Sequence, residues 1–217
     1  VRGEIMGSAL LLFLVLMPIL ASVWVFPLRR RDRRYRNDLI QIVPAVEFVA
    51  AILLVLLWPD ASLELPGVCG VGLTFQAGSL RSLLVLLSAF LWAATGLNCP
   101  NYFASAGGCN RFYLFWLMTL GALMGVFLAA DLFTLFVFFE MMSFTSYVWV
   151  AQNETPEAIR AGQTYLAVAV IGGMALLAGL VLLQHLLGTL TFAELRAAVE
   201  SLPAEKRTVL YVAGGLA

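Results

Sequence analysis

The chain has 217 residues, of which 62% are hydrophobic and 12% are charged, and its mean hydropathy is +0.94. Soluble domains carry about 25% charged residues, so this composition excludes an ordinary soluble enzyme and indicates a multi-pass protein of the cell membrane. The formal net charge is zero, and the sequence holds no Cys/His cluster, phosphate-binding loop or Ser/His/Asp set, so we expect no metal, no cofactor and no catalytic motif within it.

The first part of the chain predicts two transmembrane helices joined by a basic loop. Apolar spans cover about 6–26 and 39–58, each long enough to cross a hydrocarbon core of about 30 Å. Six arginines lie between positions 29 and 36. By the positive-inside rule, this block makes loop 29–38 cytoplasmic and puts the N-terminus outside. A basic block also suits nucleic acid, but between two spans we interpret it as a topology signal and expect no nucleic-acid partner.

The next segments alternate between loops and spans. Residues 59–79 are rich in Gly and Pro and predict an external loop that contains a small β-hairpin. A third span is expected at about 80–97, a cytoplasmic loop at 98–111 and a fourth span at about 112–130. The fourth span contains the spacing Gly121-x-x-x-Gly125, which permits close approach of another helix.

The fifth span, 131–151, contains a carboxylate in its middle. Glu140 follows Asp131 by nine residues, so it lies about 13 Å down the helix axis, near the midplane of the membrane. An ionised group there costs at least about 2.5 kcal/mol unless it faces protein or water. We interpret Glu140 as functional; the alternative is a glutamate that only packs against a neighbouring helix. Asp131 is expected to cap the N-terminus of its helix.

The remaining segments complete the predicted topology. Residues 152–161 predict a cytoplasmic loop, 162–184 a sixth span, and 188–207 an external amphipathic helix with Thr191 as its N-cap. A seventh span begins at 208 and has about ten residues in this sequence. We therefore expect the chain to be a fragment of a longer protein.

Several polar groups accompany Glu140 as candidates for a relay of protons. Desolvation disfavours the anionic form of a carboxyl group, so a carboxyl group inside the membrane can exchange protons near physiological pH. Ser143 and Tyr147 follow Glu140 at i+3 and i+7, on the same helix face, where their hydroxyls either hold water or bond to local backbone carbonyls. Glu47 in the second span is interpreted as a relay group, as half of a salt bridge or as a packing residue. His185 is interpreted as an interface residue or a relay group.

The run 121–180, which contains DLFTLFVFFEMMSF, resembles a known family. It is similar to the antiporter-like membrane subunits of respiratory complex I (NADH:quinone oxidoreductase), of Mrp-type Na⁺/H⁺ antiporters and of membrane-bound hydrogenases. The resemblance covers about 66–190. It implies an all-α, polytopic transmembrane helix bundle in which Glu140 is the proton relay, paired in the family with a lysine of a broken seventh helix. On this basis, 1–79 holds two N-terminal helices with their loops, and 80–217 begins the antiporter-like bundle and stops within the seventh helix.

Two positions depart from the family pattern. Many members carry a lysine before an aromatic residue in the sixth helix, where this chain has Thr164-Tyr165. The acid of the usual DGLS opening of the third helix is also missing, since the chain reads AGSL at 77–80. The absent lysine removes a candidate for tuning Glu140, and an accessory role of the subunit stays open.

The function expected from these observations is translocation of protons, or exchange of Na⁺ for H⁺, by one membrane subunit of a complex I-like, Mrp-like or hydrogenase-like assembly. The expected partners are other membrane subunits, the lipid bilayer, and H⁺ or Na⁺. Two alternatives remain: a structural scaffold subunit that conducts no ions, and an unrelated secondary transporter with midplane charges that bind substrate.

Overall fold

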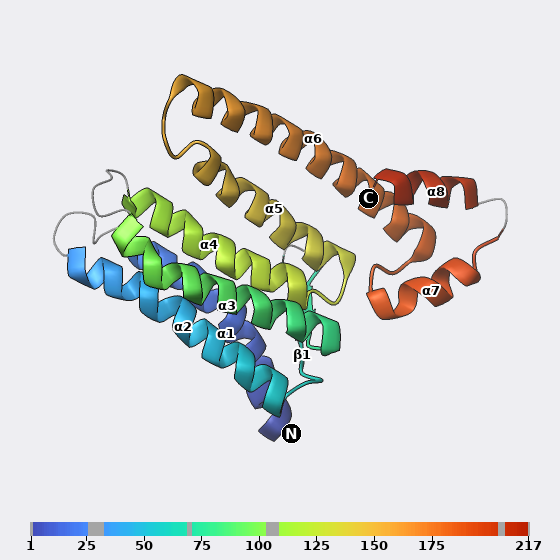
Figure 1. Cartoon of the computed structure of the whole chain (residues 1–217). Coiled ribbons are helices and arrows are strands. Elements are labelled where there is room, and N and C mark those ends of the chain that lie inside the picture. Colours follow the sequence, from blue (N-terminus) through green and yellow to red (C-terminus); the bar gives the residue numbers. More distant parts are fainter. Residues whose placement is uncertain (1, 26–32, 69–70, 103–108, 204–206, 217) are drawn as a thin grey trace.

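The computed structural model describes residues 2–25, 33–68, 71–102, 109–203 and 207–216, which form a helical bundle with one small β-hairpin (Figure 1). Within these ranges, six helices are long and apolar enough to cross a membrane. The predicted all-α, polytopic fold class is therefore confirmed. The elements in chain order are α1 (Arg2–Val25), α2 (Arg33–Leu57), β1 (Ser62–Leu65), β2 (Leu73–Gln76), α3 (Ser79–Tyr102), α4 (Cys109–Leu128), α5 (Leu132–Val150), α6 (Pro156–Leu187), α7 (Phe192–Glu200) and α8 (Arg207–Leu216).

Several helices extend past the apolar spans that predicted them. The loop expected at 98–111 is shorter, because α3 continues to Tyr102 and α4 begins at Cys109. In the loop expected at 29–38, residues 29–32 lie outside the described part of the chain, and α2 already begins at Arg33. Arginine is a good helix former, so the charged end of a transmembrane helix continues as helix beyond the hydrophobic segment. Hydropathy alone therefore located the spans correctly but underestimated the lengths of the helices.

The loop expected at 152–161 is present but shorter, because its second half is helical. Helix α6 begins at Pro156, and Thr155 is its N-cap, with a side chain that accepts a hydrogen bond from the Ala158 N–H at 3.2 Å. A threonine N-cap followed by proline at the first helical position is a known helix start. The sequence therefore carried a start signal that hydropathy did not reveal.

Helix α4 lies at the centre of the bundle and contacts α1, α3 and α5, while α6 packs on the outer side of α5 (Figure 1). The glycines of α4 make two of these contacts close. A Cβ added at Gly121 would lie 2.7 Å from the Val15 carbonyl oxygen of α1, and one at Gly125 would lie 2.8 Å from Phe138 Cδ2 of α5. The predicted role of this glycine spacing in close helix packing is confirmed, with a different partner helix for each glycine.

The buried side chains of α1 to α5 form two apolar clusters at different depths. The cluster nearer the hairpin contains residues such as Leu14, Leu54 and Leu120. The cluster nearer the opposite end contains residues such as Ile40 and Tyr113. Large apolar side chains on the outer faces of the helices stay exposed in the isolated chain, as expected for surfaces that meet lipid or other membrane subunits.

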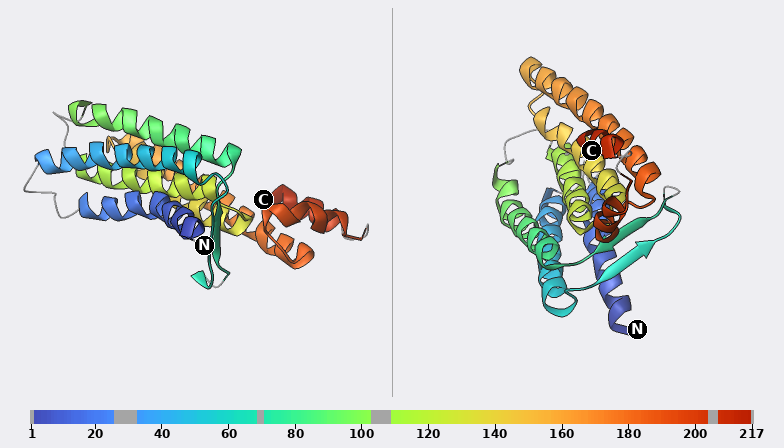
Figure 2. Two further views of the ribbon diagram at one scale, coloured as in Figure 1. Left: turned by 90° about the horizontal axis from the view of Figure 1, so that it is seen from below. Right: turned by 90° about the vertical axis from the view of Figure 1, so that its right-hand side faces the viewer.

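The predicted hairpin is present at one end of the bundle, where β1 pairs with β2 in antiparallel register (Figure 2). Backbone hydrogen bonds join it to the turn before α5, from the Ala130 N–H to the Thr74 carbonyl at 2.9 Å. The Phe192 N–H in turn donates to the Ala130 carbonyl at 3.1 Å. Three segments that are distant in sequence therefore meet at this end.

A buried aspartate fixes the same junction. Asp131 is the N-cap of α5 and accepts a hydrogen bond from the Thr134 N–H at 2.8 Å. Its carboxylate also accepts hydrogen bonds from the hydroxyl groups of Thr134 and, across the junction, Thr74. The predicted capping role is confirmed, and the structure adds a link between α5 and the hairpin.

The predicted amphipathic segment forms α7 with Thr191 as its N-cap residue. The Thr191 side chain makes no capping hydrogen bond. Glu194 instead accepts from the Thr189 hydroxyl at 2.6 Å, and that hydroxyl accepts from the Thr191 N–H at 3.2 Å. The expected helix start is therefore confirmed, while the reciprocal side-chain contacts of a capping box are absent.

Candidate functional site

Glu140 lies in the contact between α5 and α6, halfway along α5. Opposite its carboxyl group is Gly173 of α6, where an added Cβ would lie 2.6 Å from the carboxyl carbon. A side chain at this place would displace the carboxyl group, so the glycine leaves it room. The glutamate therefore faces a neighbouring helix of the same protein rather than lipid alone.

The carboxyl group of Glu140 is half-buried and has few polar neighbours. Its Oε1 is shielded from solvent and has no hydrogen-bond partner among the described residues. No ion pair involving Glu140 is formed within the described ranges. An acid in such surroundings has no fixed counter-charge on the part of the chain described, so it is available to a proton, a water molecule or a mobile cation.

Ser143 and Tyr147 accompany Glu140 along α5. Ser143 is buried, and the ring of Tyr147 meets α6 at Gly162, where an added Cβ would lie 2.9 Å from Tyr147 Cε2. The i, i+3, i+7 spacing places the three side chains on one face of α5. These three predicted residues therefore share the face of α5 that meets α6. Two glycines of α6 allow the two helices to approach each other closely there.

The other two predicted candidates lie elsewhere. Glu47 is on α2, which packs against α1 and α3, whereas α5 packs against α4 and α6. His185 is exposed in the last turn of α6. It follows Gly173 by twelve residues, which is about 18 Å along the helix axis. Neither residue joins the group around Glu140.

Thr164 is also remote from the carboxyl group of Glu140. It is exposed on α6, and its hydroxyl donates to the Arg160 carbonyl at 3.1 Å. It precedes Gly173 by nine residues, about 14 Å along the axis. The absence of a lysine at Thr164 therefore leaves the immediate surroundings of Glu140 unchanged.

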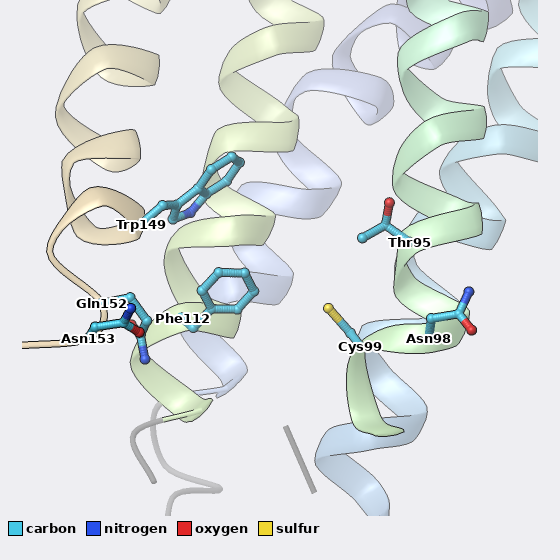
Figure 3. A pocket seen from close by; sticks show the side chains of 7 residues that line it. All are labelled: Thr95, Asn98, Cys99, Phe112, Trp149, Gln152 and Asn153. Carbon is cyan, nitrogen blue, oxygen red and sulfur yellow. The ribbon is translucent and has the colours of Figure 1, made fainter. Parts of the chain in front are cut away.

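A second feature is an open pocket of about 420 Å³ at the end of the bundle opposite the hairpin (Figure 3). The Nε1 of Trp149 and the Oε1 of Gln152 are buried here without hydrogen-bond partners among the described residues. Sequence reasoning did not find this pocket, because it forms between three helices and a turn. It is lined by Thr95, Asn98, Cys99, Phe112, Trp149, Gln152 and Asn153.

The described residues contain no group of three or more His, Cys, Asp or Glu side chains placed to hold a metal ion. Sequence reasoning also did not assign Gly173 and Gly162 to particular neighbours. The glycines of the sixth span indicated tight packing, but the residues that they accommodate became visible only when α5 and α6 were placed side by side.

Comparison with known proteins finds a family that matches the second half of the chain. Residues 129–215, which extend from the turn before α5 into α8, match the family described as NADH:quinone oxidoreductase/Mrp antiporter, TM. The resemblance to antiporter-like membrane subunits found in the sequence is confirmed by this match.

Individual proteins with similar sequences are described as antiporter subunits. The chain is 28% identical over 211 residues to a probable K(+)/H(+) antiporter subunit of Rhizobium meliloti, with 93% of this chain and 39% of the relative covered. It is 30% identical over 190 residues to a putative antiporter subunit of Staphylococcus saprophyticus, with 85% and 38% covered. The chain thus spans about two fifths of the length of these curated relatives.

Solved structures share the fold. A chain of the Mrp complex from Dietzia sp. superposes with a TM-score of 0.76 at 25% identity, with 97% of this chain and 39% of that chain covered. A chain of the archaeal membrane-bound sulfane sulfur reductase gives a TM-score of 0.80 at 22% identity, with 95% and 42% covered. A chain of respiratory complex I from Thermus thermophilus gives 0.74 at 21% identity, with the same coverage of 95% and 42%. The last two likenesses show the fold alone.

Proposed function

We propose that the chain is part of a membrane subunit that moves protons, in exchange for Na⁺ or another monovalent cation or coupled to a redox partner, and that Glu140 is its proton relay. Glu140 binds a proton at mid-depth in the membrane and releases it again as its electrostatic surroundings change. An opposite charge within about 4–6 Å favours the anion, and its withdrawal favours reprotonation. The chain supplies the acid of this exchange.

The observation that supports the proposal most is the placement of the Glu140 carboxyl group against Gly173. A carboxylate that faced lipid would be costly without serving any pathway, and one in a permanent ion pair would hold its charge. Glu140 avoids both arrangements within the described residues, since it faces α6 and has no ion-pair partner there. Ser143 and Tyr147 add hydroxyl groups on the same face, which suit a chain of water molecules.

The names of the relatives support the kind of ion movement that we propose. One relative is a probable K(+)/H(+) antiporter subunit, and others are putative antiporter subunits. The solved structures of similar fold come from multisubunit membrane complexes. We therefore propose other membrane subunits as partners, with the apolar outer faces of the bundle in contact with those subunits and with lipid.

The orientation that we propose follows from charge. The arginine-rich segment between α1 and α2 would face the cytoplasm, and the N-terminus and the hairpin would lie outside. Six spans are then consistent with the turn between α5 and α6 on the cytoplasmic side.

The proposal is tested by Glu140→Gln in the full-length subunit, assembled in its complex and reconstituted in vesicles. The amide has nearly the same shape as the acid and cannot exchange a proton at this position. We expect loss of cation- or redox-driven proton movement, measured with a pH-sensitive dye, with unchanged assembly.

The matched control is Glu157→Gln, the same change at an exposed glutamate in the first turn of α6. This variant should move protons at the rate of the unmodified protein. Retained proton movement in Glu140→Gln would contradict the relay and favour a scaffold role for this chain.

A further inference from the structure

Glu47 is the one fully buried carboxyl group among the described residues, and it lies outside the Glu140 site. Its residue exposure is 0%, and neither Oε1 nor Oε2 has a hydrogen-bond partner within the part of the chain described. Buried polar atoms are nearly always paired with protein or water. Two unpaired oxygens on one buried acid therefore call for a ligand that the protein atoms themselves do not supply.

The depth of Glu47 in the bundle is defined by its neighbours on α2. One to two turns towards the start of the helix, Val43 and Ile40 belong to the apolar cluster nearer the end opposite the hairpin. One to two turns further on, Ala50, Ala51 and Leu54 belong to the cluster nearer the hairpin. Glu47 itself lies between the two clusters, so its carboxyl group is closed off from both ends of the bundle by apolar side chains.

A salt bridge, which the sequence left open for Glu47, is not formed within the described residues. The charged residues of α1, α3 and α4 all lie in terminal turns: Arg2 and Glu4, Arg81, and Arg111. On α2, the nearest basic residue is Arg36, eleven positions before Glu47 and thus about 16 Å away along the axis. The other titratable side chains described on these helices are also distant or lie in an apolar cluster. Asp38 and Tyr35 precede Glu47 on α2 by nine and twelve positions. Cys99 and Tyr113 belong to the apolar cluster nearer the end opposite the hairpin.

A free backbone acceptor lies on the same side of Glu47. Pro44 lies inside α2 and has no N–H, so the Ile40 carbonyl lacks its usual intrahelical donor. Gly96 of α3 packs closely against this carbonyl, since a Cβ added there would lie 2.9 Å from the Ile40 oxygen. Long side chains on a helix lean towards its N-terminus, which directs the Glu47 side chain towards the turn of Pro44.

We propose that Glu47 is a second proton-binding site of this subunit, a neutral carboxylic acid in the resting protein that exchanges its proton during ion movement. The ionised form would be buried without a partner, which is costly, whereas the neutral form carries no charge and needs only a hydrogen-bond partner, which a bound water molecule can supply. The inference rests on the proposed function, because it assigns Glu47 to the same movement of protons. It places the second site on α2, which packs against α1 and α3, separate from the contact between α5 and α6.

The test uses the full-length subunit in its complex and two readouts. Infrared difference spectra on exchange from H₂O to D₂O report protonated carboxyl groups, and reconstituted vesicles report proton movement. In Glu47→Gln we expect loss of an exchangeable carboxyl band that the unmodified protein and Glu140→Gln both show, together with reduced proton movement. Glu64→Gln, the same change at an exposed residue of β1, should alter neither readout.

The inference is overturned if Glu47→Gln keeps the carboxyl band or moves protons at the unmodified rate. Should Glu47→Gln fail to assemble, Glu47→Asp carries the test: a shifted exchangeable band supports the site, and an unshifted band overturns it. The two proposals fail separately. Full activity of Glu140→Gln contradicts the relay at Glu140 alone, and full activity of Glu47→Gln contradicts the second site alone.

Discussion

Gly173 of α6 lies directly opposite the carboxyl group of Glu140 on α5, so close that an added Cβ would be 2.6 Å from the carboxyl carbon. The position of the acid is therefore determined by a residue on another helix. A glutamate at mid-depth is a common way to place a proton acceptor in a membrane protein, but its environment depends on the neighbour that makes room for it.

Replacing Gly173 with alanine should displace the carboxyl group of Glu140. The new methyl group would occupy the position of the carboxyl oxygens, so we expect loss of driven proton movement in reconstituted vesicles while the subunit still assembles. Gly172→Ala is the matched control, because no atom lies within 4 Å of a Cβ added there. Both changes raise helix propensity by about 1 kcal/mol, so a difference between them isolates the contact with Glu140. Equal activity of the two variants would show that this contact has no functional role.

Gly125→Ala should destabilise the packing of α4 on α5. The added Cβ would lie 2.8 Å from Phe138 Cδ2, and overpacking of this kind costs about 1–3 kcal/mol. We expect a lower thermal midpoint for the purified full-length subunit in detergent. The double variant Gly125→Ala/Phe138→Leu should recover part of the loss, because the two sites are in contact and their effects are not additive. Gly214→Ala, with no atom within 4 Å, serves as the control.

Asp131→Ala should loosen the hairpin from the end of α5. The change removes the N-cap acceptor of α5, worth about 1 kcal/mol, and the partner of two threonine hydroxyls. We expect faster cleavage of the β1–β2 hairpin by protease in sealed vesicles that expose this end. Asp60→Ala, an exposed aspartate between α2 and β1, should leave the cleavage rate unchanged. Similar rates in the two variants would refute the link through Asp131.

The orientation of the chain can be measured with single cysteines, after the native Cys69, Cys99 and Cys109 have been replaced by serine. Asp60→Cys at the hairpin end should react with a membrane-impermeant maleimide in intact cells. Asn153→Cys, in the exposed turn between α5 and α6, should react only after permeabilisation. This result follows from the arginine-rich segment by the positive-inside rule. The reverse pattern of labelling would invert the proposed topology.

Much of the fold could be predicted because the membrane imposes simple requirements. Apolar runs of about 20 residues have to be helices in lipid, since the backbone must satisfy its own hydrogen bonds. The six spans, the hairpin, the capping role of Asp131 and the resemblance to antiporter-like subunits were therefore available from the sequence, and the structure and the comparisons confirm them. Helix ends were harder, because Thr155-Pro156 and the arginines of α2 act through local geometry rather than hydropathy.

The sequence by itself determined which acids lie near the middle of their apolar spans, because that place follows from the position along a helix of fixed rise. Only the tertiary structure decided what each acid faces. Glu140 meets a glycine of α6, while Glu47 is enclosed between two apolar clusters without a partner in the described part of the chain. The physical reason is that the surroundings of a side chain depend on which helices pack against its face of the helix. Those contacts join residues far apart in sequence.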